Sequence, residues 1–196
     1  VDDFSTQLVG THQMRRTIRV LHPQSLYGWG TPNACLDLLK GMVSAGADIR
    51  FYTRRVMNPA SLGAVPTKTA IPHSLARLHH PRLEGWAERR IHNMFLRDLA
   101  PGDVAWVWPP TQGWLHEEVA ARGNPLVLEG INTRMAYARD ILRAEYAREG
   151  LPDTSGLTQE RVDHEEHSLS LAAAQFAPSP EVAASLRRAD SCFKGV

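Results

Sequence analysis

The chain has 196 residues, of which 43% are hydrophobic and 22% charged, and its formal net charge is +1 at pH 7. These values are typical of a globular domain with its own core, and the near-zero charge argues against nucleic acid as the main partner. Cys35 and Cys192 match no metal or disulfide spacing, and no apolar run reaches the roughly 20 residues of a membrane span, so we expect a cytoplasmic protein without a bound metal.

The first thirteen residues, VDDFSTQLVGTHQ, show no period typical of a helix or a strand, and they lack the pattern of a secretion signal. Met14 and the following RRTIRVLH look like a natural start. We therefore expect residues 1–13 to be a flexible leader or a cloning remnant, and residues 14–190 to form one domain.

Strand and helix patterns alternate along the rest of the chain. A strand is predicted at 18–22, followed by a helix that begins at the N-cap Thr31 with Pro32 and ends at Gly46. After a strand at 48–53, residues 54–82 look like a long loop. The remaining predictions are a helix at 83–99, a strand at 104–108, a helix at 113–122, a strand at 126–129, helices at 135–149 and 159–174, a strand at 175–177, and a helix from the N-cap Ser179 to 188.

This alternation predicts an α/β fold, a Rossmann-like three-layer domain in which a mostly parallel sheet has helices on both faces. In such sheets, ligands bind beyond the carboxyl ends of the strands. Three loops, 23–33, 109–113 and 129–134, should therefore converge on one crevice.

The first of these loops contains Gly28-Trp29-Gly30-Thr31 at a junction between a strand and a helix. The glycines could simply fit the turns of the loop. Alternatively, they let a phosphate or a sugar approach the bare backbone at a helix N-terminus, where the Trp29 ring could stack on a sugar ring. Thr31 and Asn33 would be further substrate contacts.

A nicotinamide-dinucleotide site is a rival interpretation of the same glycines, with Arg54 or Arg55 contacting a 2′-phosphate. The match is poor, because five residues separate His22 from Gly28 and Asn33 takes the place of the third glycine. An NADP-dependent oxidoreductase nevertheless stays open as an alternative.

Glu129, Asn132 and Arg134 follow the strand sequence PLVLE. A carboxylate at the end of a strand suits proton transfer or hydroxyl binding, although Glu129 could instead cap the next helix or pair with Arg134. Trp114 is a candidate for ligand contact, whereas Trp106 and Trp108 share one face of the sheet and should pack in the core.

The sequence DHEEH at 163–167 offers a metal site or, more simply, a solvated helix face, since it has no zinc-protease spacing. Glu166 is different because it is in line with Val162 and Leu169 on the side that should be buried. A buried glutamate needs a partner, so we expect Glu166 to anchor a loop or another helix.

Residues 77–97 form a basic window that includes Arg77, Arg82, Arg89, Arg90 and Arg97. Its apolar side, with Ile91, Met94 and Phe95, is compatible with a plain surface helix or with peripheral contact at the inner face of the membrane.

The sequence EEHSLSLAAAQFAPSPEVAASL resembles the stretch that closes the N-terminal domain of GT-B-fold glycosyltransferases, particularly the large retaining family that uses nucleotide sugars. Glu166, Ser179 and Val182 fall at the matching spacing, while Ala174 replaces the family's aspartate. Four earlier segments occur in the same order as in the family: TIRVLHPQ, GWGTP, ACLDLLKGMVSAGADIRFYTRR and PGDVAWVWPP. The resemblance therefore covers nearly everything after Met14.

The resemblance implies one half of a GT-B fold. Residues 191–196 would begin a linker to a C-terminal domain that is absent here, together with its pair of glutamates. The donor would be a nucleotide-diphosphate sugar, with no permanently bound cofactor.

In this arrangement, Gly28, Trp29 and Gly30 would line the cleft, and Glu129, Asn132 and Arg134 would bind the sugar acceptor, with Glu166 and Ser179 in structural roles. The family's histidine after PLVLE is missing, which leaves the catalytic residue unknown and Glu129 as a weak candidate. A self-contained sugar- or partner-binding domain is a further alternative.

Overall fold

The computed structural model describes residues 16–78, 80–188 and 190–193. The predicted leader at 1–13 and the last three residues of the predicted linker lie outside this range. None of the helices in the described part of the chain combines the length and apolar content that a bilayer crossing requires.

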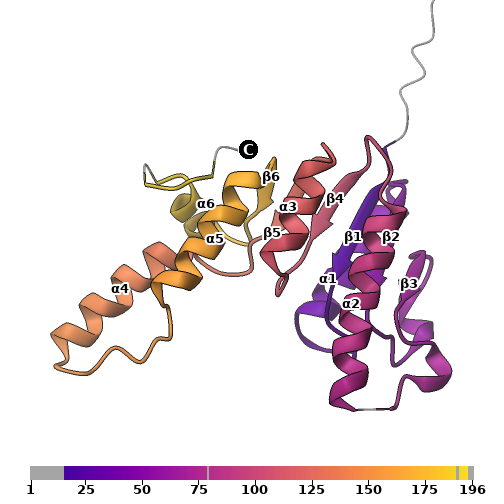
Figure 1. Cartoon of the computed structure of the whole chain (residues 1–196), viewed down its shortest axis with the longest axis horizontal. Coiled ribbons are helices and arrows are strands. Elements are labelled where there is room, and N and C mark those ends of the chain that lie inside the picture. Colours follow the sequence, from indigo (N-terminus) through magenta and orange to yellow (C-terminus); the bar gives the residue numbers. More distant parts are fainter. Residues whose placement is uncertain (1–15, 79, 189, 194–196) are drawn as a thin grey trace, which may run out of the picture.

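A six-stranded sheet forms the centre of the domain, and all its strand pairings are parallel (Figure 1). The spatial order is β3-β2-β1-β4-β5-β6. The order reverses between β1 and β4, as in doubly wound Rossmann sheets. The strands are β1 (Ile18–His22), β2 (Ile49–Thr53), β3 (Thr67–Thr69), β4 (Val104–Val107), β5 (Leu126–Glu129) and β6 (Ala174–Phe176).

Helices cover both faces of this sheet, which confirms the predicted three-layer α/β fold. The helices are α1 (Gly30–Ser44), α2 (Pro81–Asp98), α3 (Gly113–Ala121), α4 (Met135–Arg148), α5 (Gln159–Leu171) and α6 (Pro180–Leu186). On one face, Cys35, Leu36 and Leu39 of α1 pack against β1, β2 and β4. On the other face, α2, α3 and α5 bury their apolar sides against the sheet. Helix α4 has no buried residue and projects from the body of the domain (Figure 1).

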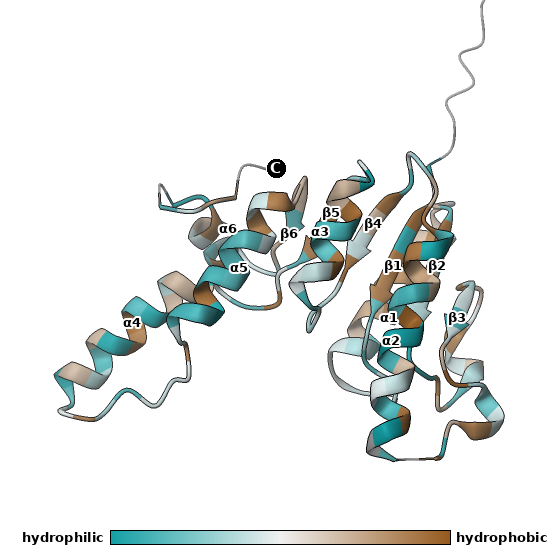
Figure 2. Cartoon of the chain, viewed as in Figure 1, coloured by the Kyte–Doolittle hydropathy of each residue, from teal (hydrophilic) through white to brown (hydrophobic). Residues whose placement is uncertain are grey.

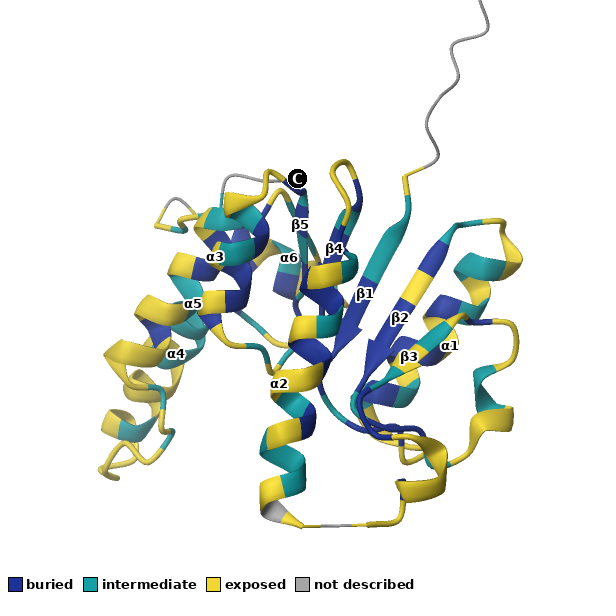
Figure 3. Cartoon of the chain, turned by 45° about the vertical axis from the view of Figure 1, so that its right-hand side comes forward, coloured by how far each residue is buried: buried dark blue, intermediate teal, exposed yellow. Residues whose placement is uncertain are grey.

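The core lies on the central strands, which appear dark blue in Figure 3 and largely brown in Figure 2. Trp106 and Trp108 are both buried on the face that α1 covers, and their ring centroids are 5.7 Å apart. The predicted core packing of these two tryptophans is therefore confirmed.

Two local predictions are wrong. Helix α1 begins at Gly30 rather than after Thr31, with an extended Trp29 as N-cap and no side-chain capping bond, because Gly30 turns the chain with a φ of 73°. The predicted loop 54–82 contains β3, which continues the sheet beyond β2 and includes a hydrogen bond from the Phe51 N–H to the Pro66 carbonyl. Strand β3 has three residues only, too few to show a period.

The basic window corresponds mainly to α2. Ile91 and Phe95 are buried against the sheet rather than exposed on an interfacial side. The outer surface of the helix presents Trp86, with the Arg90 guanidinium 5.2 Å from its ring centroid. Membrane contact through this window stays a prediction.

The end of β5 leaves no room for a side chain at position 130. A Cβ on Gly130 would lie 2.9 Å from the Phe176 carbonyl oxygen and would also meet the Gln175 amide. We expect Gly130→Ala to destabilise the domain by about 2 kcal/mol, because β5 and β6 must separate. Gly41→Ala, inside α1 with no atom within 4 Å of the new Cβ, should instead stabilise it by up to about 1 kcal/mol. Urea unfolding measures both, and an equal effect of the two substitutions would contradict this packing.

Candidate functional site

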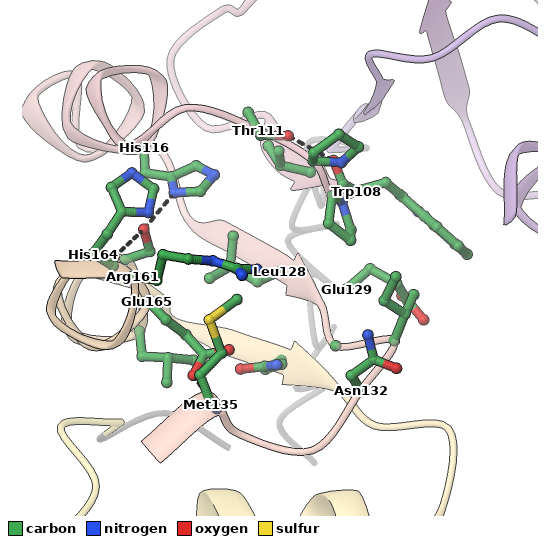
Figure 4. Close-up of a pocket in the computed structure, with 18 of the residues that line it drawn as sticks. Trp108, Thr111, His116, Leu128, Glu129, Asn132, Met135, Arg161, His164 and Glu165 are labelled. Atoms are coloured by element: carbon green, nitrogen blue, oxygen red, sulfur yellow. Dashed lines mark hydrogen bonds between the residues drawn. The ribbon is translucent and has the colours of Figure 1, made fainter. Parts of the chain in front are cut away.

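A hollow of about 620 Å³ lies at the carboxyl ends of β4 and β5, between these strands and the helices α3, α4 and α5 (Figure 4). Two of the predicted loops line it, with residues 109–111 and 129–133. The third predicted loop, 23–33, contributes no lining residue, so the three loops do not converge here. That loop leads into α1 on one face of the sheet, whereas α3 and α5 belong to the other face.

His116 of α3 is the most deeply buried titratable side chain of the hollow. Its Nδ1 lies 3.0 Å from the Ser168 hydroxyl of α5, and that hydroxyl donates to the His164 carbonyl. Its Nε2 points into the hollow (Figure 4) and has no hydrogen-bond partner in the described part of the chain. Burial, followed by the charges of neighbouring histidines, lowers the pKa of His116 to about 4, so the ring is neutral at pH 7.

Sequence reasoning missed His116, which lies in the helical sequence GWLHEEVAA. The one available signal was its place directly after Leu115 and three residues before Val119, both buried. This spacing puts a histidine on the inward side of a helix. Its partner Ser168 is 52 residues away in sequence, so the contact itself has no local signature.

The residues of the DHEEH sequence have separate partners instead of sharing a metal site. His164 Nε2 accepts a hydrogen bond from the Gly113 N–H at 3.0 Å, and His167 Nε2 lies 2.9 Å from Glu117. Glu165 lines the hollow and accepts from the Met135 N–H at 2.5 Å, which caps α4, and burial raises its pKa. Within the described ranges, no group of three or more His, Cys, Asp or Glu side chains could hold a metal ion.

Arg134 and Glu166 form a buried ion pair, with Arg134 Nη1 3.3 Å from Glu166 Oε1. The other terminal nitrogen of Arg134 lies 2.6 Å from Asp190, and Glu166 also accepts from the Cys192 N–H at 2.9 Å. Glu166 thus ties the start of α4 to the C-terminal segment, as an anchor should. An acceptor contact by Arg134 would require breaking both ion pairs, and it stays a prediction.

Glu129 is among the residues that line the hollow, and its side chain is directed away from His116 and His164 (Figure 4). Its carboxylate accepts from Trp106 Nε1 at 3.3 Å. Burial raises the pKa of Glu129 to about 7, although the tryptophan bond favours the charged form. Other glutamates fill the two structural roles weighed for Glu129: Glu165 caps α4 and Glu166 pairs with Arg134.

The glycine loop is open to solvent. Gly28 and Gly30 have φ values of 91° and 73°, and no atom lies within 4 Å of a Cβ built on Gly28. Trp29 between them is 74% exposed, and the Tyr27 ring lies 6.5 Å from it in a stacked arrangement. Asn33 donates to Asp37, one turn further along α1.

Trp114, the third aromatic candidate, lies at the start of α3 and is 41% exposed. Its indole N–H donates to the Gln112 side chain at 2.7 Å, and its ring meets His92 edge-on. It therefore belongs to the α3 side of the sheet, whereas Trp29 belongs to the α1 side.

The two arginines of the NADP hypothesis are already paired. Arg55 is fully buried, donates to the Ala76 and Leu78 carbonyls, and forms an ion pair with Glu84. Arg54 lies 3.4 Å from the same carboxylate. A 2′-phosphate would have to displace Glu84 from both guanidinium groups.

No protein-family model matches the chain, and no curated protein matches its sequence. The strand order, the parallel sheet and its two helical layers make the chain a Rossmann-like α/β domain.

Proposed function

We propose that this domain is the acceptor-side half of a glycosyltransferase that uses a nucleotide-diphosphate sugar. The observation that carries the proposal is the Tyr27–Trp29 pair, exposed at the carboxyl edge of a Rossmann-like sheet beside glycines with open backbone. Large aromatic side chains exposed next to bare main chain suit the apolar face of a sugar ring.

Backbone groups at the same edge support binding of the donor's phosphates. The N-cap of α1, Trp29, makes no side-chain capping bond, so the first N–H groups of α1 are not satisfied by a cap. Such groups bind anions, and they would stabilise a departing nucleoside diphosphate. Thr31 and Asn33 belong to the same turn of the helix and would extend this contact.

Glu129 is the candidate for proton transfer from the acceptor. A carboxyl group with a pKa of about 7 is divided between its two protonation states near neutral pH, which suits a general base. Asn132, three residues further on, would hold an acceptor hydroxyl.

Tryptophan signals test this proposal, because the chain has five tryptophans and each gives one indole N–H signal in a proton–nitrogen correlation spectrum. We expect millimolar UDP-glucose and methyl α-D-glucopyranoside to shift the Trp29 signal and to leave that of Trp86 unchanged. Trp29→Ala should weaken this binding about fivefold, since an aromatic contact contributes about 1 kcal/mol. Trp86→Ala, at a tryptophan with 42% exposure on α2, is the matched control.

The alternatives give other results. A Trp29 signal that no sugar shifts, or an equal loss of affinity in both variants, would overturn the proposal. Micromolar binding of NADPH, followed by its fluorescence, would favour the oxidoreductase instead. A self-contained sugar-binding domain would show the same sugar shifts but no added effect of UDP.

A further inference from the structure

The hydrogen-bond network around His116 favours one of the two neutral tautomers of its ring. The Ser168 hydroxyl has one proton, which it donates to the His164 carbonyl at 3.0 Å. With that proton engaged, the contact with His116 Nδ1, also at 3.0 Å, fits the Nδ1–H tautomer, in which the imidazole donates. A neutral imidazole has a single N–H, so Nε2 carries a lone pair instead.

This lone pair is buried and unpartnered. His116 is 6% exposed, and Nε2 points into the hollow, where it meets no donor from the described residues (Figure 4). A buried acceptor without a partner costs about 1–3 kcal/mol, so a ligand that donates a hydrogen bond to Nε2 would remove this cost.

A second acceptor of the same kind lines the hollow. The Gln175 amide oxygen, on β6, is also buried without a partner in the described part of the chain. The walls between these two acceptors are mainly apolar, with Val107, Leu128 and Leu169. The hollow thus has the size of small-molecule sites, roughly 300–1,000 Å³, and two of its polar atoms are acceptors that hydroxyl groups of a ligand would satisfy.

We propose that the hollow binds a small polyhydroxylated ligand, a sugar or a cyclitol, whose hydroxyl groups donate to His116 Nε2 and to the Gln175 amide oxygen. The ligand class deepens the proposed function and rests on it, since this ligand would be the sugar acceptor or a part of it. The assignment adds a site that is separate from the Trp29 loop and lies on the other face of the sheet.

Nitrogen NMR of the His116 ring in the unmodified protein tests the assignment directly. We expect the ring to be the Nδ1–H tautomer at pH 7, with an unprotonated Nε2 signal. Methyl α-D-glucopyranoside or myo-inositol, added at millimolar concentrations, should move this Nε2 signal toward that of a hydrogen-bonded nitrogen. An Nε2–H tautomer, or an Nε2 signal that neither compound moves, would overturn the proposal.

Two variants separate the acceptor from the packing of the ring. His116→Phe keeps a flat ring but removes the lone pair, and it should weaken binding of the glucoside about three- to tenfold. Ser168→Ala leaves the ring in place but removes the acceptor of the Nδ1 proton, so the neutral ring is free to carry its proton on Nε2 and binding should weaken by a similar factor. Binding that neither variant weakens would contradict a contact through Nε2, and the wild-type spectra decide the question if His116→Phe does not fold.

The Trp29 signal, recorded in the same titration, distinguishes this site from the proposed function. A sugar that shifts Trp29 but not His116 overturns the hollow as a site and leaves the proposed function standing. A sugar that shifts His116 but not Trp29 supports the hollow and removes the Trp29 loop from the acceptor site. No shift at either position overturns both.

Discussion

Replacing Arg134 with alanine should lower the free energy of unfolding by about 3 kcal/mol, because it leaves the Glu166 carboxylate buried without its cation. The Arg134 side chain is fully buried, and the Glu166 side chain is only 15% exposed. The change also disconnects the start of α4 from Asp190 in the C-terminal segment. Urea unfolding followed by tryptophan fluorescence measures the loss.

Asp190→Asn is the matched control for this prediction. It removes the other charge that pairs with Arg134, but the Asp190 side chain is 56% exposed. An exposed partner contributes about 0–1 kcal/mol, so the loss should be small. Combining Arg134→Met with Glu166→Leu should recover most of the loss, because neither charge then stays buried alone. If Arg134→Ala costs no more than Asp190→Asn, the pair is not the anchor described here.

The parts of the fold that sequence predicts well depend on neighbouring residues. Strands β1 and β5 occupy the predicted residues, because each is a short segment with β-branched residues that is next to a proline. Ser179 caps α6 through a hydrogen bond from the Val182 N–H, as its Ser-Pro sequence indicates. Gly46 follows the end of α1 with a φ of 87°, a conformation that favours glycine.

The hollow could not be predicted in the same way, because its polar groups come from segments that meet only in the folded sheet. His116 and Ser168 lie on different helices, and Gln175 lies on the edge strand next to β5. Sequence spacing drew attention to Glu129 and to DHEEH instead. Three consecutive α5 residues, His164, Glu165 and Glu166, have three unrelated partners, and helical periodicity alone does not distinguish them.

Acid should destabilise the domain well above the pH at which its paired carboxylates titrate. Burial lowers the pKa of His22 to about 4, helped by the charge of Arg54, and it lowers the pKa of His116 to about 4 as well. In the unfolded chain both groups return to 6.5. Between pH 6.5 and 4 the unfolded state therefore binds protons that the folded state does not, and stability falls with pH.

The size of this effect is at most about 3 kcal/mol for each histidine, since one pKa unit corresponds to about 1.4 kcal/mol. Glu129 acts in the opposite direction. Its pKa is raised from 4.5 to about 7, so the folded state binds the extra proton in this window and Glu129 favours the folded state as the pH falls. Because Glu129 is partly solvated, we expect it to offset only about 1 kcal/mol.

Urea unfolding at intervals between pH 4 and 7.5 separates these contributions, because a different substitution removes each one. His22→Phe and His116→Phe should each flatten the fall of stability with decreasing pH, and the double variant should keep a smaller fall, because burial also lowers the pKa of His92. Glu129→Gln should make the fall steeper, since it removes a group that takes up a proton in the folded state, as Glu165 also does because burial raises its pKa. Asp98 and Asp190 have lowered pKa values and lose their stabilising contributions below about pH 4, outside the window. If the stability of the double histidine variant depends on pH as steeply as that of the wild type, neither ring is buried in its neutral form. Nε2 of His116 would then not be the acceptor that the hollow requires.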